Sequence, residues 1–140
     1  MAEQFMQLDV VTPEKAILSR KVTEVVAPGS MGEFAVLTGH TPFLTTLRAG
    51  QIIARTEDRD IYIAVSGGFA EVTGDRVIIL AEAADQAEDI NVQEITQELE
   101  QAEAKLKSLG KEDAEYSRWE NRARNAEVKI RVAENWEKNQ

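Results

Sequence analysis

The spacing of apolar residues changes once along this chain, near residue 88, and this change restricts the fold more than any other feature. Before it, apolar and polar residues alternate, as at Ile61, Ile63 and Val65, and this period of two is typical of half-buried strands. After it, glycine becomes scarce and the strong helix formers Ala, Glu, Lys, Arg and Gln dominate. The sequence predicts a β-domain at residues 1–87 and a helical domain at residues 88–140.

Turn signals divide the first part into short strands. They recur roughly every 8 to 12 residues between β-rich runs, which is typical of an antiparallel sandwich or barrel. Gly67-Gly68 is one such signal, because glycine can take the positive φ that a tight hairpin needs. The continuous apolar run from Val77 to Leu80 predicts a strand that is buried on both faces or that faces a second sheet.

Two apolar stripes follow the change, each with the spacing of three and four residues that marks one face of a helix. Asn91 precedes the first stripe and Glu94 comes three residues later, which predicts a helix N-cap. The first stripe contains Val92, Ile95, Leu99, Ala102, Leu106 and Leu109, and the second Tyr116, Trp119, Ala123, Ala126, Ile130 and Ala133. Gly110 lies just past the first stripe, and a break of roughly two to four residues would give an antiparallel hairpin.

The second stripe is mostly alanine, which allows close approach but buries little apolar area. At about 25 cal/mol per Å² of buried apolar surface, such a hairpin has a thin margin over its ordering entropy. We expect it to pack on something else, either the β-domain or a partner helix. Two interpretations stay open from the pattern: a fixed helical lid, and a mobile tail with more than one docking position.

The composition of the chain argues against several classes of function. The net charge of −9 argues against nucleic acid as a main partner, because phosphate contacts need clustered Lys and Arg. The chain has no cysteine and one histidine, so neither a Cys-ligated nor a multi-His metal site is expected. No apolar run approaches the roughly 20 residues that span a bilayer, and we expect no signal peptide.

Catalytic motifs are not evident. His40 could act as a lone general base, but no nucleophile or oxyanion hole is signalled, so a turn or interface residue is favoured. Gly29-Ser30-Met31-Gly32 lacks the Gly-Lys-Ser/Thr ending of a phosphate-binding loop and is interpreted as a turn. The sequence predicts no catalytic residue, no metal and no cofactor.

Three segments resemble one family. Gly29 to Leu44 is similar to the G-x-x-G-E-x-x-V-L-x-G-H-x-P-x-L signature of the epsilon subunit of bacterial and chloroplast ATP synthases. Ser66 to Val72 resembles the S-G-G-F-x-E-V hairpin of that family, and Leu8 to Glu14 resembles its opening. The order and spacing of all three agree, and the helical tail corresponds to the tail of the family. The resemblance covers essentially the whole chain.

The resemblance implies a flattened antiparallel β-sandwich of about ten strands followed by a two-helix hairpin. It implies a non-catalytic rotor subunit of the central stalk, which couples proton translocation to ATP synthesis. The sandwich would contact the gamma subunit and the polar loops of the membrane c-ring, peripherally, on the cytoplasmic face of the bacterial inner membrane. The hairpin would fold on the sandwich or extend toward the alpha and beta subunits, where it restrains ATP hydrolysis.

The family's contact residues map onto two loops and one helix. Gly29, Ser30, Met31, Gly32 and Glu33 match the loop that faces the c-ring, and His40, Thr41 and Pro42 match the adjacent loop at the same c-ring and gamma interface. A carboxylate and exposed turn amides can bond polar loops at a wet, modest interface. Arg118, Arg122 and Arg124 correspond to bases that would meet an acidic segment of beta in the extended state, although an ordinary mixed-charge helix face is an equal interpretation.

One departure from the family concerns nucleotide binding. Some bacterial members bind ATP through an I/L-D-x-x-R-A motif at the first helix and arginines on the second. Here Asn91 stands at the Asp position, Glu94 at the Arg position and Ile95 at the Ala position, and the second-helix arginine positions fall on Asn125 and Lys129. Because Glu94 places negative charge where phosphates would lie, we predict that the chain does not bind ATP tightly.

Two other classes of function are kept as alternatives. A free adaptor would bind a helical partner through its tail and would purify without the ATP synthase core. A small hydrolase would use His40 with nearby carboxylates and would lose activity in His40→Ala. The sequence does not decide which tail position is preferred, how strong the restraint is, or which ion is coupled.

Overall fold

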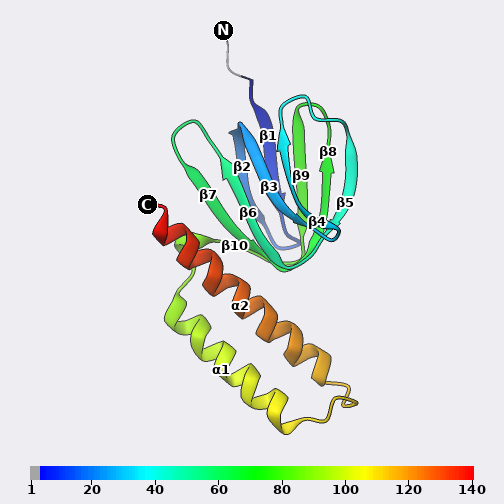
Figure 1. Cartoon of the computed structure of the whole chain (residues 1–140), viewed down its shortest axis with the longest axis vertical. Helices are drawn as coiled ribbons and strands as arrows, with labels where there is room; N and C mark the ends of the chain where they lie inside the picture. Colours follow the sequence, from blue (N-terminus) through cyan, green and yellow to red (C-terminus); the bar gives the residue numbers. More distant parts are fainter. Residues whose placement is uncertain (1–3) are drawn as a thin grey trace.

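The computed structural model describes residues 4–140. The strands are β1 (Met6–Val11), β2 (Ala16–Val22), β3 (Glu24–Gly29), β4 (Gly32–Leu37), β5 (Phe43–Leu47), β6 (Gly50–Arg55), β7 (Asp60–Val65), β8 (Gly68–Val72), β9 (Arg76–Ala81) and β10 (Ala84–Gln86). A short 3₁₀ helix, η1 (Ala87–Asp89), leads into α1 (Val92–Ser108) and α2 (Tyr116–Lys138). The predicted ten-stranded sandwich followed by a helical hairpin is confirmed (Figure 1).

The strands form one sheet that folds over on itself. Its order is β10-β7-β6-β3-β5-β8-β9-β1-β2, and β4 pairs with β3 off this path. The pairs are antiparallel apart from β1 and β9, which run parallel. Gln86 Nε2 on β10 donates to the carbonyl of Ile17 on β2 at 3.1 Å, so the two ends of the sheet meet and the sandwich is nearly closed.

Apolar side chains from alternate strand positions fill the space between the two layers. The largest fully buried ones there include Met6, Leu8, Val10, Ile52, Ile63, Val72, Val77 and Ile79. The residues of this core cluster, and the half-buried ones packed against it, all precede residue 85. The sandwich therefore has a core to which the helical tail contributes nothing.

The sequence left two possibilities for the run from Val77 to Leu80: a strand buried on both faces, or a strand with one face toward a second sheet. Val77 and Ile79 point into the core, so β9 faces the second layer. Leu80 points outward and is 54 % exposed, so the strand is not buried on both faces. Ile78 on the same outer side is half-buried, so the described residues cover this side of the strand only in part.

Gly68 at the start of β8 is needed for the close approach of two strands. Its φ is +145°, and a Cβ there would lie 2.0 Å from the carbonyl oxygen of Leu80. Any side chain would force the β8–β9 pair apart. This steric requirement explains the predicted Gly67-Gly68 turn, where both glycines have positive φ.

The helices begin as the sequence predicts but are joined by a longer connection. The side chain of Asn91 accepts a hydrogen bond from the amide of Glu94 at 3.1 Å, which confirms the N-cap. The connection spans residues 109–115, longer than the expected break of two to four residues. An extra turn forms there because Asp113 accepts hydrogen bonds, through its side chain from the amide of Glu115 and through its carbonyl from the amide of Tyr116.

Helix α2 buries two faces against two different neighbours. Its alanine stripe faces α1, and α1 lies on the far side of α2 from the sheet (Figure 1). Val128 and Val132 belong instead to a second apolar cluster with Tyr62 and Ala64 of β7 and Ala87 of η1. Sequence reasoning missed this second face. Val128, Val132 and Trp136 do recur at spacings of four residues, a signal obscured by the charged residues between them.

Candidate docking surfaces

The β3–β4 turn and the loop before β5 both line one shallow groove that runs along β4 and β5. Gly29, Met31, Gly32 and Glu33 line one side of it, and His40 lies on the other. The structure therefore brings together the two loops that the sequence singled out. Ser30, Thr41 and Pro42 belong to the same turns and are exposed.

Hydrogen bonds and close packing hold the β3–β4 turn in place. The amide of Ser30 donates to the carbonyl of Thr46 at 3.0 Å, and their hydroxyls lie 2.6 Å apart. A Cβ on Gly29 would lie 2.7 Å from the carbonyl oxygen of Gly32, so this turn closes tightly only with glycine. At its tip the side chain of Met31 is 99 % exposed. The turn is a rigid projection that ends in an apolar side chain and a carboxylate.

Aromatic rings form the floor of this groove. Phe34 and Phe43 pack edge to face with centroids 5.3 Å apart, and the His40 ring lies 5.1 Å from Phe43. His40 Nδ1 lies 2.8 Å from the carbonyl oxygen of Thr41, which sets the orientation of the imidazole. His40 is thus a half-buried loop residue whose ring packs beside Phe43.

An apolar surface covers the outer side of the layer formed by β5, β8, β9 and β1. We call it the outer apolar face and define it by Leu44, Phe69, Leu80, Val11 and Ile78. Strand register pairs Phe69 with Leu80 and Leu80 with Val11, so these three form a row across β8, β9 and β1. Leu44 is 69 % exposed and Phe69 is 52 % exposed. Val11 and Ile78 are half-buried, and Glu71 lies between Leu44 and Ile78. Exposed apolar side chains gathered on one side of a sheet are typical of surfaces that associate with other proteins.

The three tail arginines do not form one basic face. Arg118 and Arg122 are four residues apart and share one side of α2, whereas Arg124 lies on roughly the opposite side at about 100° per residue. Arg122 lies over the ring of Trp119 at 4.7 Å, and Arg124 donates to the side chain of Asn121 at 2.7 Å. All three are exposed. A single acidic segment could therefore meet Arg118 and Arg122 together but not Arg124.

The positions that correspond to the ATP motif have other roles here. The Asn91 side chain caps α1, and Glu94 is exposed beside it. Asn125 and Lys129 line a groove between α1 and α2 together with Glu98 and Gln101. Lys129 Nζ lies 3.3 Å from a carboxylate oxygen of Asp85 on β10, so its charge is already paired. Arg122 lines the same groove, so its two bases lie beside the Glu98 carboxylate and the Asp85 carboxylate that pairs with Lys129.

Residues 4–140 contain no candidate metal cluster and no candidate membrane span. Within that range no group of three or more His, Cys, Asp or Glu side chains is placed to hold a metal ion. No helix described by the structure is long and apolar enough to cross a membrane.

The fold places this chain among proteins that combine a β-sandwich with a C-terminal helical hairpin. Its sandwich also carries an exposed apolar face. Residues 5–87 match the family model for the ATP synthase, Delta/Epsilon chain, beta-sandwich domain. The chain is 40 % identical over 133 residues to the ATP synthase epsilon chain of Geobacter sulfurreducens, covering 95 % of this chain and 96 % of that one. It is 42 % identical over 130 residues to ATP synthase epsilon chain 2 of Syntrophotalea carbinolica, covering 93 % and 94 %. The chain belongs to the ATP synthase epsilon chain family.

Solved structures show the same fold at lower identity. A chain in the cryo-EM structure of the Euglena gracilis mitochondrial ATP synthase (OSCP/F1/c-ring) matches with a TM-score of 0.69 and 24 % identity, covering 99 % of this chain and 82 % of that one. A chain in the central stalk/c-ring structure of the Tetrahymena thermophila mitochondrial ATP synthase matches with a TM-score of 0.54 and 14 % identity, covering 97 % and 98 %. Both helices are thus included in the shared fold.

Proposed function

We propose that this chain is a non-catalytic subunit of the central-stalk rotor of a bacterial ATP synthase. In this role it couples proton translocation to ATP synthesis and lies peripherally at the cytoplasmic face of the inner membrane. The sandwich, residues 1–87, attaches to the rotor, and the tail, residues 88–140, restrains ATP hydrolysis. The observation that carries the proposal is the outer apolar face on a sandwich that belongs to the epsilon chain family.

The gamma subunit is the proposed occupant of the outer apolar face. Phe69, Leu80 and Leu44 expose more than half of their surface, although the sandwich core is complete without them. Burying such side chains contributes about 1.5–3 kcal/mol each, which suits a permanent attachment. On the same outer side Glu71 lies between Leu44 and Ile78, and Asp9 lies beside Ile78, so a partner here would also need polar groups for two carboxylates.

The groove between the β3–β4 turn and the His40 loop is the proposed contact with the polar loops of the c-ring. Met31 and Glu33 project at its edge, and the rings of Phe34 and Phe43 form its floor. An exposed carboxylate beside a shallow aromatic groove suits a small polar loop that carries a base. The rigid turn would transmit torque without deforming, because Ser30 is bonded to Thr46 on β5.

The alpha and beta subunits are the proposed partners of the tail in an extended position. Arg118 and Arg122 on one side of α2 are the bases available for an acidic segment there. The tail shares no residue with the sandwich core, so a second tail position would leave the sandwich folded.

Co-purification tests the proposal. A tagged copy of the full chain, expressed in its own cells and extracted in mild detergent, should bring down the catalytic core and the c-ring together. Recovery of soluble monomeric proteins alone, with no synthase subunit, would instead make the chain a free adaptor. A matched preparation that carries the tag alone controls for adhesion to membranes.

Titration calorimetry should detect no binding of ATP to the isolated subunit at micromolar nucleotide concentrations. The reason is that Glu94 replaces an arginine and Lys129 is paired with Asp85. The triple variant Asn91→Asp, Glu94→Arg, Ile95→Ala, which rebuilds the first-helix motif, should bind more tightly than the natural chain. A micromolar dissociation constant for the natural chain would refute this prediction.

A further inference from the structure

The outer apolar face contains a carboxylate that no base of the described chain neutralises. Strand register places Glu71 of β8 between Leu44 of β5 and Ile78 of β9, and its side chain is exposed. No ion pair among residues 4–140 includes Glu71. An unpaired negative charge therefore lies in the middle of the surface that is proposed to bind another subunit.

A base lies within reach of Glu71 on the neighbouring strand. Arg76 lies on the outer side of β9, two residues before Ile78, and is therefore diagonal to Glu71 across the antiparallel β8–β9 pair. Diagonal neighbours of this kind lie about 7–8 Å apart, which a long side chain can span. Arg76 could thus neutralise Glu71, but the structure gives it a different partner.

Arg76 turns toward β1 and binds Asp9. Its Nη2 atom lies 2.9 Å from Oδ2 of Asp9. The other carboxylate oxygen of Asp9 accepts hydrogen bonds from the Ser19 hydroxyl at 2.7 Å and from Gln7 Nε2 at 3.3 Å, and Gln7 also donates to Ser19 at 2.9 Å. Most of the polar groups that Asp9 needs therefore come from its own chain, and its side chain is 17 % exposed.

The same contacts keep Asp9 ionised and in place. The hydrogen bond from Ser19 holds the pKa of the Asp9 carboxyl below its usual value against the opposing effect of burial, and Gln7 and Arg76 lower the pKa further. A carboxylate that is already ordered loses less side-chain entropy on pairing than the exposed carboxylate of Glu71. Asp9 therefore holds the guanidinium that lies between the two acids.

We propose that Glu71 binds a lysine or arginine of the gamma subunit, and that Asp9 is a positioning residue that leaves Glu71 free for this contact by holding Arg76. The inference rests on the proposed attachment to gamma and adds a charge requirement to it. A partner that covers Leu44 and Ile78 also removes the carboxylate between them from water. Such a carboxylate is costly to cover unless a base pairs with it. The charge pair also fixes the register of the partner on an otherwise apolar surface.

Removal of the Glu71 charge tests the contact directly. The affinity of the full-length subunit is measured for a gamma-containing core that lacks this subunit. Glu71→Gln should weaken binding by about tenfold or more and should make binding less dependent on salt, because the base of the partner is then covered without a counter-charge.

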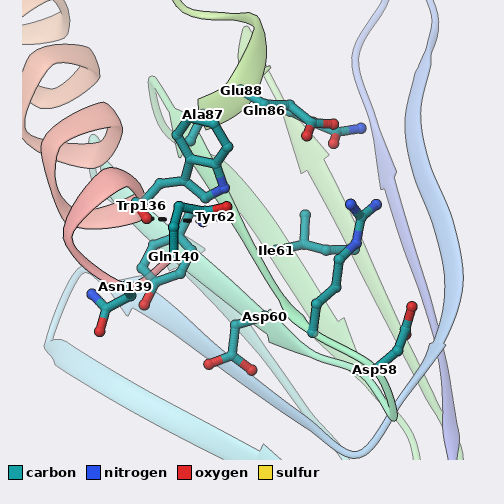
Figure 2. Close-up of a pocket in the computed structure, with 11 residues that line it drawn as sticks. Asp58, Asp60, Ile61, Tyr62, Gln86, Ala87, Glu88, Trp136, Asn139 and Gln140 are labelled. Atoms are coloured by element: carbon teal, nitrogen blue, oxygen red, sulfur yellow. Dashed lines mark hydrogen bonds between the residues drawn. The ribbon is translucent and has the colours of Figure 1, made fainter.

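Glu88 provides a matched control. It lies on η1 and lines the pocket beside the C-terminal end of α2 (Figure 2). Its side chain is exposed like that of Glu71, and no ion pair among residues 4–140 includes it. Glu88→Gln makes the same chemical change away from β8 and β9, so binding should stay within about a factor of two of the natural chain.

A rescue experiment tests the role of Asp9. Asp9→Ala should weaken binding, because the released Arg76 then pairs with Glu71. The double variant Asp9→Ala, Arg76→Gln should bind more tightly than Asp9→Ala alone, because the second change frees Glu71 again. A purely structural role of Asp9 predicts no such recovery, since the double variant has lost the hydrogen-bond network as well. Thermal unfolding of each isolated variant establishes that the compared chains are folded.

The possible outcomes separate this inference from the proposed function. Unchanged affinity of Glu71→Gln would overturn the contact with a base, and absence of recovery in the double variant would overturn the role of Asp9. If Leu80→Asp weakens binding while Glu71→Gln does not, the attachment surface stands and the charge contact fails. If neither change weakens binding, the attachment surface itself is wrong.

Discussion

Removal of residues 89–140 should raise ATP hydrolysis by the assembled complex by about fivefold or more, the lower end of the effect of coupling free energies of 1–3 kcal/mol. The physical reason is that, in the proposed role, the tail reaches the catalytic subunits while the sandwich stays on the rotor. The sandwich should fold without it, because the core between its layers contains no tail residue. Hydrolysis rates of the intact and truncated complexes, measured at several ATP concentrations, give the effect.

The comparison needs two controls. Thermal unfolding of the isolated fragment 1–88 should show one cooperative transition, which establishes that the sandwich is intact. Equal recovery of truncated and full-length chains with the complex establishes equal assembly. If both conditions are met and the hydrolysis rate does not change, the tail does not restrain hydrolysis in this enzyme.

Leu80→Asp should weaken attachment of the subunit to the rotor by about 100-fold or more. Loss of a buried leucine costs about 1.5–3 kcal/mol, burial of an unpaired carboxylate adds to that cost, and each 1.4 kcal/mol is a factor of ten in affinity. The fold itself should tolerate the change, because the Leu80 side chain is 54 % exposed and points away from the core. Binding to a gamma-containing core that lacks this subunit provides the measurement.

Leu37→Asp is the matched control for this experiment. Leu37 is 59 % exposed, and it lies on β4, which pairs with β3 away from β8 and β9. The same chemical change at similar exposure should leave binding within about a factor of two, as is usual for surface substitutions away from special features. Equal affinities of the two variants would mean that the outer apolar face is not the attachment surface.

The period-two pattern of the first part was a reliable guide because each strand buries one face. Met6, Leu8 and Val10 alternate in the sequence and are all fully buried in the structure. The N-cap at Asn91 was equally predictable, because a cap is a local contact between residues three apart. Exposed apolar residues were harder to interpret, since the type and spacing of Leu80 do not distinguish it from a core residue.

The candidate sites were predictable to different degrees. The motif loops at Gly29–Glu33 and His40 could be found from their residues, although their meeting in one groove depends on how β3, β4 and β5 pair. The second face of α2 was not found, because Val128 and Val132 acquire their role from Tyr62 and Ala64, far away in the sequence. The separation of Arg124 from Arg118 and Arg122 follows from helical geometry and needs no tertiary information.

By itself the sequence determined the β-sandwich followed by helices and the family, and it supports the prediction that ATP is not bound tightly. These properties depend on residue type and spacing within short segments, where local propensity and periodicity are sufficient. The tertiary structure alone decided where the tail docks and which apolar side chains remain uncovered. Both depend on contacts between residues distant in the sequence, such as Asn135 with Gln51, and no local pattern encodes such a pairing.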